Sequence, residues 1–295
     1  MNREEFLLAR SSGVGGSDSA AALGLSPYKT TYELWLEKTK QLAAEDLDDV
    51  ERIQFGRLME DIIAREYARR TDVKVRRRNQ VIRHAKYPWM LANVDRVIEG
   101  VRRGLECKNV DSMAYRMGEW GEPGSDQVPE HYLMQCHHYM IVLDYPEWDL
   151  AACVGGNSLV TYTIRRDAEL EEMILEGEHE FWQRVEKHEA PEPDYTHPTT
   201  LALLKRMYTG TDGGEIEFGE DLAHWHRVKQ MADERVKEYE AVSDGAKAHM
   251  LRAMGNAAIA RLPDGSTYKR KEVTRKAYEV AQMTYVDFRW AKAKE

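Results

Sequence analysis

Apolar residues recur along the chain in two patterns, one typical of helices and one typical of strands. Helical spacing predicts helices over residues 30–39, 55–70, 129–143 and 167–188. Strand-like runs lie near residues 74–84, 90–99, 104–110, 148–154 and 159–164. The order of helix, three strands, helix and further strands predicts a layered α/β core.

The C-terminal part of the chain differs from this core. Three prolines in residues 189–200, followed by the turn-rich stretch "TGTDGGE", predict the end of the compact domain at about residue 200 and a linker over residues 201–220. Residues 221–295 are predicted to form a helical extension with a small β-hairpin at "LPDG". Its helix has an apolar stripe and a possible break at Asp244–Gly245; the stripe consists of Leu222, Trp225, Ala232, Val236, Tyr239, Ala246 and Met250.

Composition narrows the class of protein. No run of about 18 apolar residues exists, and the N-terminus "MNREEFLLAR" is charged from its third residue, so neither a membrane span nor a secretory signal is predicted. The three cysteines lack any C-x-x-C spacing, which argues against disulfides, structural zinc and iron–sulfur clusters. We therefore expect a cytoplasmic protein with buried thiols and no membrane partner.

The net charge of −9 hides a local reversal. Residues 65–108 carry thirteen Lys and Arg against five Asp and Glu, and include the run Arg76-Arg77-Arg78. A basic segment in an acidic chain is a candidate phosphate-binding surface, with Arg76 and Arg78 as candidate contacts, because cations that replace counterions supply most non-specific affinity for DNA. The alternative is an ordinary solvated charged face.

Two acids and a lysine stand on strand-like segments in "NVDRVIEGVRRGLECKNV". Glu106 and Lys108 are two residues apart and therefore point to the same face of a strand. If the two strands pair as a hairpin, Asp95 lies near Glu106, and two close carboxylates repel unless a proton or cation separates them. Mg²⁺ suits such a pair and phosphodiester chemistry, and a nearby ammonium helps to position or deprotonate the attacking water. The alternative is an exposed hairpin with a weak Glu106–Lys108 ion pair.

Two further polar residues interrupt predicted apolar faces. Glu60 falls on the buried stripe of the helix over residues 55–70, where a carboxylate needs a partner or a metal. Gln135 lies beside Tyr132 and Tyr139 on the helix over residues 129–143. Taken alone, Gln135 is better explained as a core amide that hydrogen-bonds the backbone.

Five ordered blocks across roughly residues 10–165 carry a family resemblance: "GVGGSDSAAALGLSPYKTTYELWLEKT", "FGRLMEDIIAREYARRT", "ANVDRVI", "GLECKN" and "EHYLMQCHHYMIVL". With these blocks the sequence resembles the YqaJ-type viral recombinases, phage exonucleases related to lambda exonuclease within the PD-(D/E)XK superfamily. Val94 stands where the superfamily motif has proline, a common departure. The resemblance implies a restriction-endonuclease-like α/β core, with a mixed central sheet flanked by helices. Residues 201–295 match no catalytic block.

The resemblance also implies site residues. Asp95, Glu106 and the backbone carbonyl of Cys107 would hold Mg²⁺, with Mn²⁺ as a substitute, and Glu60 would complete the site directly or through water. Lys108 and Gln135 would orient the attacking water. Arg10 and Ser17 fall where relatives bind the terminal phosphate, and Ser17 follows glycines at a helix start that favours an anion; an ordinary helix cap is the alternative for Ser17.

The activity implied is 5′-to-3′ digestion of one strand of linear duplex DNA, which leaves single-stranded tails for an annealing protein in the cytoplasm of a phage-bearing host. Relatives form rings of three, which makes a homo-oligomer an expectation here. Two alternatives remain. One is an endonuclease or a Cas4-like nuclease of the same fold, the latter disfavoured because the cysteine cluster is missing; the other is a DNA-binding module with a vestigial site.

Overall fold

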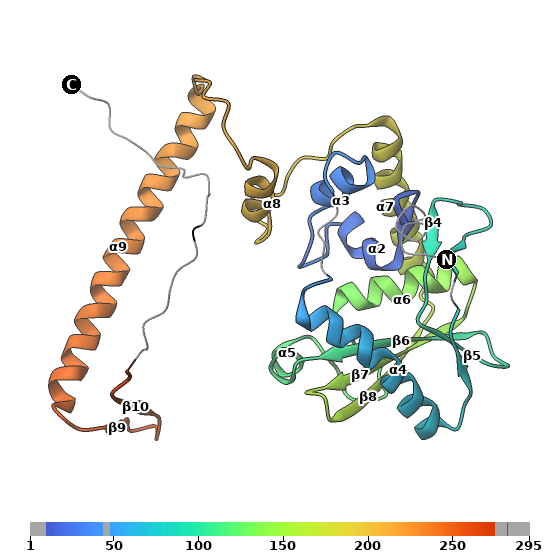
Figure 1. Ribbon diagram of the computed structural model, residues 1–295, viewed down its shortest axis with the longest axis horizontal. Coiled ribbons are helices and arrows are strands. Elements are labelled where there is room, and N and C mark those ends of the chain that lie inside the picture. Colours follow the sequence, from blue (N-terminus) through green and yellow to red (C-terminus); the bar gives the residue numbers. More distant parts are fainter. Residues whose placement is uncertain (1–9, 44–47, 79, 275–281, 283–295) are drawn as a thin grey trace. The chain divides into compact units, whose positions relative to one another are not determined.

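A computed structural model describes residues 10–43, 48–78, 80–274 and 282 of the chain (Figure 1). The chain divides into two compact units, Met1–Met207 and Tyr208–Glu295. The predicted linker over residues 201–220 contains most of a helix, α8 (Thr200–Met207), whose Leu203 packs in the core of the first unit. The apolar face of this helix explains why the compact unit continues past the prolines. Residues 275–281 and 283–295 of the predicted extension lie outside the described residues.

A five-stranded mixed sheet is the centre of the first unit. Its strands, in spatial order, are β2 (Val75–Arg76), β5 (Arg96–Ile98), β6 (Arg103–Val110), β7 (Glu147–Val154) and β8 (Ser158–Arg165). The β6–β7 pair is parallel and the other pairs are antiparallel. A small second sheet has the order β1 (Val14–Gly15), β4 (Met90–Ala92) and β3 (Ile82–Arg83).

Helices cover both faces of the central sheet. One face packs on α4 (Glu51–Thr71), and α6 (Glu130–Leu143) packs beside the other. Beyond α6 lie α2 (Gly16–Ala22), α3 (Thr31–Lys38) and α7 (Ala168–Lys187), so that α6 is enclosed between these helices and the sheet (Figure 1). The short helix α5 (Ser112–Met117) follows directly after β6. This mixed α/β arrangement confirms the predicted fold class.

The alternation of side chains along the strands explains why both faces of the sheet are covered. Leu105 and Ala151 belong to an apolar cluster with Ile63 and Tyr67 of α4. Neighbouring positions point the other way, and Trp148, Leu150 and Ala152 join the cluster that contains α6. A sheet with two apolar faces must be buried on both sides.

Two predicted strands differ from the observed ones. The run near residues 74–84 is only β2 and β3, which belong to different sheets because the chain turns away at the arginines that follow β2. The run near residues 90–99 divides into β4 and β5, also in different sheets, and Asp95 lies in the connection. Asp95 therefore stands in the connection between two sheets rather than inside a strand.

The second unit contains the helix α9 (Glu220–Met254) and the antiparallel hairpin β9 (Ile259–Arg261) and β10 (Thr267–Lys269). The predicted break at Asp244–Gly245 is wrong, because α9 is continuous through both residues. A single helical glycine costs about 1 kcal/mol, which a long helix tolerates. Across the ranges the structure describes, no helix is long and apolar enough to cross a bilayer.

Gly104 provides a test of the packing between the sheet and α6. A Cβ atom at Gly104 would lie 2.2 Å from the ring of Trp148, which is fully buried. We expect Gly104→Ala to lower the free energy of unfolding by about 1–3 kcal/mol through overpacking. In α4, Gly56 faces open space, so Gly56→Ala should instead raise it by up to about 1 kcal/mol. Denaturant unfolding followed by tryptophan fluorescence measures both changes, and equal effects of the two substitutions would contradict the packing.

Candidate active site

The register between β5 and β6 places the two acids opposite each other. Arg96 pairs with Leu105, so Asp95, one residue earlier, stands at the level of Glu106. The backbone N–H of Cys107 donates a hydrogen bond of 2.9 Å to Asp95 Oδ2. In a strand the N–H and C=O of one residue point to the same edge. The Cys107 carbonyl therefore points to the same strand edge as the Asp95 carboxylate. A metal ion bound by both groups would require this arrangement.

Glu106, Lys108 and Gln135 form one hydrogen-bonded group. Lys108 Nζ lies 2.7 Å from Glu106 Oε1 and donates to Gln135 Oε1 at 3.0 Å. Gln135 Nε2 donates to the same Glu106 oxygen at 2.8 Å. Glu106 and Lys108 lie on the same face of β6, as predicted, and this face meets Gln135 of α6. The alternative of an exposed hairpin does not fit, because Glu106 is buried.

The second oxygen of Glu106 lies where a cation would fit. Glu106 Oε2 is buried and, among the described residues, has no hydrogen-bond partner. An unpaired buried carboxylate oxygen is costly unless a proton or a cation faces it. A divalent ion held by Asp95, Glu106 and the Cys107 carbonyl fits this donor set, because Mg²⁺ takes one or two carboxylates and further oxygen ligands.

Electrostatics of the pair agree with this fit. Burial and the charge of Glu106 raise the pKa of Asp95 well above its usual value, against the opposing effect of Lys108. Burial alone would lower the pKa of Lys108, but the charges of Glu106, Tyr132 and Asp95 together with the hydrogen bond to Glu106 outweigh it and raise the pKa above its usual value. Lys108 is therefore a cationic hydrogen-bond donor here. This favours a role in positioning the attacking water over a role in taking a proton from that water.

Glu60 is placed differently from a simple third ligand. It lies on α4 and approaches closely enough for its charge to raise the pKa of Asp95. Its Oε1, however, accepts a 2.5 Å hydrogen bond from Arg96 Nη1. Within the described part of the chain, no group of three His, Cys, Asp or Glu side chains is arranged to hold a metal. The structure thus brings Asp95 and Glu106 together and leaves Glu60 beside them, in an ion pair.

Arg96 is the main site residue that the sequence analysis missed. It is buried and donates to Glu60, to the Asp95 carbonyl at 2.6 Å and to Asp61 at 2.8 Å. The position of Arg96 in the sequence could have indicated this role. An arginine between Asp95 and the apolar Val97 in a short strand points to the face opposite Asp95, and it needs acidic partners if that face is buried.

Two tyrosines of α6 support the hydrogen-bonded group. Tyr132 lies under Lys108, whose Nζ is 4.8 Å from the ring centre. The Tyr139 hydroxyl accepts from Gln135 Nε2 at 3.0 Å and donates to the Asn93 carbonyl at 3.1 Å. Helical spacing places both tyrosines beside Gln135, but a sequence cannot say where their hydroxyl groups point.

Arg10 and Ser17 are also brought together. Arg10 Nη2 donates to Ser17 Oγ at 3.0 Å and to Asp18 Oδ1 at 3.2 Å. Lys38 Nζ, almost fully buried, lies 2.7 Å from the other Asp18 oxygen. Arg10 and Lys38 thus surround the buried Asp18 carboxylate, next to the exposed Ser17.

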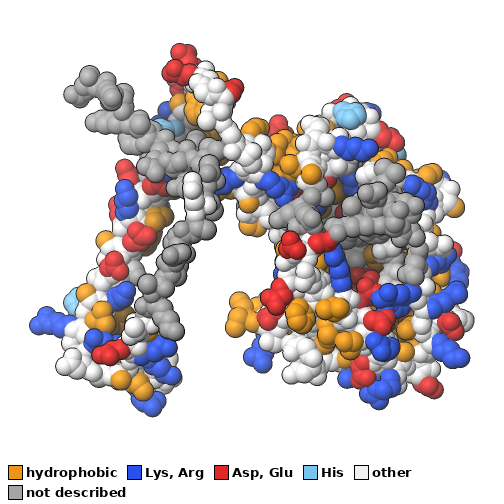
Figure 2. Space-filling model, viewed as in Figure 1, with side chains coloured by type: hydrophobic (Ala, Val, Ile, Leu, Met, Phe, Trp, Pro, Cys, Tyr) orange, Lys and Arg blue, Asp and Glu red, His pale blue; other side chains and the backbone are white. Residues whose placement is uncertain are grey.

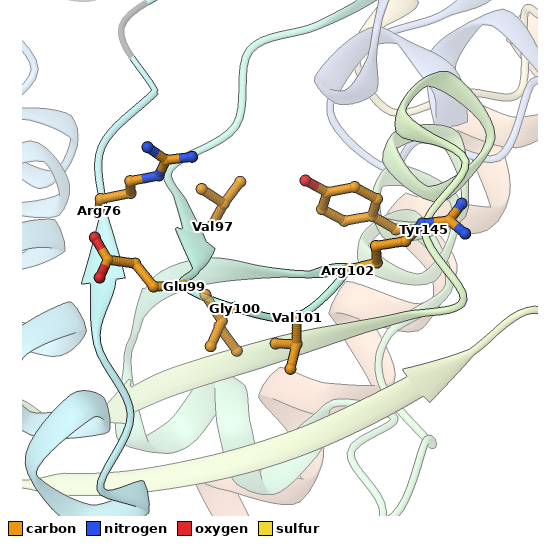
Figure 3. A pocket seen from close by; sticks show the side chains of 8 residues that line it. Arg76, Val97, Glu99, Gly100, Val101, Arg102 and Tyr145 are labelled. Carbon is orange, nitrogen blue, oxygen red and sulfur yellow. The ribbon is translucent and has the colours of Figure 1, made fainter.

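The predicted basic surface lies on the edge strand β2 and the turn after it. Arg76, Arg77, Arg78 and Gln80 line one shallow depression, while Arg76, Glu99, Arg102 and Tyr145 lie around a neighbouring one (Figure 3). Lys and Arg side chains gather over this flank of the first unit (Figure 2). Arg77 lies within 4 Å of Glu60 and Asp61, whereas Arg76 is exposed to solvent.

Comparison with known proteins assigns the family. The sequence profile of the YqaJ-like viral recombinase domain matches residues 5–146. A protein of Bacillus subtilis (strain 168), named uncharacterized protein YqaJ, is 38% identical over 246 residues, which cover 82% of this chain and 75% of that protein. The chain belongs to the YqaJ-like viral recombinase family. This result confirms the resemblance seen in the five sequence blocks. The mixed sheet between α4 and α6 agrees with the α/β core that the resemblance implies.

Solved structures with a similar chain path include two exonucleases. One is an alkaline exonuclease, LHK-Exo, from Laribacter hongkongensis, which is 16% identical with a TM-score of 0.47 and covers 63% of this chain and 93% of its own. The other is a phage related exonuclease from Haemophilus somnus 129PT, 12% identical with a TM-score of 0.46, covering 60% of the YqaJ-family chain and 94% of its own.

Asp95 allows a test of the site without any activity measurement. A carboxyl group whose pKa is higher in the folded than in the unfolded state makes the protein less stable as pH rises from the unfolded pKa through the folded pKa. In EDTA at a pH above that window, Asp95→Asn should therefore raise the free energy of unfolding. The control Asp61→Asn should lower it, since the pKa of Asp61 is depressed, mainly by its hydrogen bond to Arg96 against the effect of burial. Thermal unfolding measures both changes, and destabilisation by Asp95→Asn would contradict the crowded acid pair.

Proposed function

We propose that this protein is a divalent-metal-dependent deoxyribonuclease that degrades linear duplex DNA from its ends. The observation that carries the proposal is the close pair of half-buried Asp95 and buried Glu106. One Glu106 oxygen has no hydrogen-bond partner among the described residues, and a cationic lysine and a bridging glutamine lie beside it. Membership in the YqaJ-like viral recombinase family supports an action on DNA. The names of the two similar structures, both exonucleases, agree with it.

Asp95, Glu106 and the Cys107 carbonyl would hold Mg²⁺, or Mn²⁺ in its place, with Glu60 joining directly or through water. The bound cation would polarise the phosphodiester and make a coordinated water acidic. Lys108 would donate to the attacking water or to the phosphate oxygens and offset their developing charge. Gln135 fixes the direction of Lys108 through its Oε1, and Tyr139 fixes Gln135.

Cleavage assays with matched substrates test the proposal. We expect the wild-type protein to degrade linear duplex DNA in Mg²⁺ and to spare covalently closed circles, and we expect no cleavage in EDTA. Glu106→Gln should abolish cleavage but keep duplex binding in Ca²⁺ within about tenfold, because it removes a metal ligand and not the phosphate contacts. Lys108→Ala should lower turnover by a factor on the order of 10² to 10³, the range for one lost transition-state donor.

The outcomes separate the alternatives. Cleavage of closed circles would identify an endonuclease. Binding without cleavage of either substrate would identify a DNA-binding module with a vestigial site. Normal Mg²⁺-dependent turnover by Glu106→Gln would contradict the assignment of Glu106 and its neighbours as the active site.

We further propose that digestion runs from 5′ to 3′ and supplies single-stranded tails to an annealing protein, in a homo-oligomer such as a ring of three. Arg76 and Arg78 would contact the duplex along the basic surface beside β2. A 5′ end carries a phosphate with more than one negative charge, and Arg10 with Ser17 offers a fork of donors for it. Lys38 adds a second cation on the far side of Asp18.

Arg10 provides the test of end recognition. Linear duplex with a 5′-phosphate should be degraded faster than the same duplex with a 5′-hydroxyl, and Arg10→Ala should erase most of this preference without stopping cleavage. Arg69→Ala, which removes an exposed arginine of α4 that pairs with Glu66 of the same helix, is the matched control and should keep the preference. Initial rates on both substrates decide the matter. Equal wild-type rates on the two substrates would show that the protein does not recognise the terminal phosphate. A preference that survives Arg10→Ala would show that residues other than Arg10 bind this phosphate.

A further inference from the structure

An exposed tyrosine stands on a well-fixed turn between α2 and α3. Pro27 restricts the backbone next to Tyr28, and the Tyr28 N–H donates a hydrogen bond of 3.2 Å to Ser26 Oγ. The Ser26 carbonyl accepts a hydrogen bond of 2.9 Å from His197 Nε2. The Tyr28 side chain is nevertheless 61% exposed. A ring that is held in place and left in water can bind a flat ligand at little cost in conformational entropy.

An aromatic surface continues from Tyr28 to the candidate active site. The rings of Tyr28 and His131 meet edge to face, with centres 5.3 Å apart and planes at 89°. The rings of His131 and the next residue, Tyr132, have centres 4.0 Å apart. Tyr132 in turn lies under Lys108, which contacts Glu106. Three rings thus lead from the solvent to the lysine beside the proposed cation position.

Positive charge borders these rings. Burial raises the pKa of Tyr132, and the charges of Lys108 and of Arg52, an exposed residue of α4, oppose this rise. His131 is neutral at physiological pH, because burial and the charge of Lys108 lower its pKa to about 4. It therefore provides ring surface rather than a charged phosphate contact. Aromatic rings combined with cations are typical of sites that bind single-stranded nucleic acid.

We propose that Tyr28, supported edge-on by His131, stacks on a nucleobase of the strand that enters the candidate active site. This inference rests on the proposed function, which brings a DNA strand to Lys108. A base next to a scissile phosphate must leave the duplex to reach a buried site, and stacking on an aromatic ring offsets part of the lost base stacking. Every base has a flat face, so the site would favour unpaired nucleotides without reading their sequence.

A binding experiment that removes the base and the ring in turn tests the proposal. The full-length protein is titrated in Ca²⁺ with a duplex that ends in two unpaired 5′ nucleotides, and with the same duplex in which these two nucleotides lack their bases. The abasic tail keeps its phosphates, so the charge is unchanged. We expect the wild-type protein to bind the abasic tail about 5- to 100-fold more weakly, the range for one lost base–aromatic stack.

Two variants show whether Tyr28 is responsible. Tyr28→Ala should bind both tails as weakly as the wild-type protein binds the abasic tail, because the base and the ring are two halves of one contact. Tyr28→Phe keeps the ring and should keep the preference for the intact tail within about twofold. Equal binding of both tails by the wild-type protein, or a preference that persists in Tyr28→Ala, would overturn the proposal.

The readout also separates this inference from the proposed function. The same pair of duplexes with 3′ tails tests polarity, and a Tyr28-dependent preference found only there would retain the stacking site and contradict 5′-to-3′ digestion. The preference without any cleavage in Mg²⁺ would retain the stacking site and contradict the nuclease. Cleavage without the preference would contradict the stacking site alone.

Discussion

The candidate site depends on the repulsion between two carboxylates that the fold forces together. Register between β5 and β6 sets Asp95 opposite Glu106, and both lie where water solvates them poorly. Around this pair the neighbouring groups have defined tasks. Lys108 offsets the charge, Gln135 joins Lys108 to Glu106, and the Cys107 N–H fixes Asp95. Among the described residues, these groups leave one oxygen of Glu106 without a partner, and that oxygen is the position that we propose for a divalent cation.

The layers of the fold explain how the pair is held. Leu105 and Cys107 point to α4, so Glu106 and Lys108 must point to α6, where Gln135 and Tyr139 meet them. Arg96, on the α4 side, binds Glu60 and Asp61 and so connects the helix to the strand beside Asp95. The site is thus built on strands and helices that are packed on both sides, an arrangement that keeps polar groups in fixed geometry.

Much of this arrangement could be predicted from the sequence, and the exceptions have physical causes. The two-residue spacing of Glu106 and Lys108 fixed their common face, and helical spacing placed Gln135 inward. The pairing of Glu60 with Arg96 could not be foreseen, because it depends on how α4 crosses the sheet. Each of the predicted strands near residues 74–84 and 90–99 is divided between two sheets. This division also depends on tertiary packing and could not be predicted from the local sequence. In α9, the continuous helix through Gly245 shows that one weak position does not end a long helix.

A crystal structure of the protein soaked with Mn²⁺ tests the central claim most directly. Anomalous scattering locates the ion independently of any assumption about activity, and the account predicts a peak within about 2.0–2.3 Å of carboxylate oxygens of both Asp95 and Glu106, close to the Cys107 carbonyl. The same soak of Glu106→Gln should show no peak or a much weaker one. A wild-type crystal without an ion between these two carboxylates, or with the ion bound elsewhere, would contradict the account.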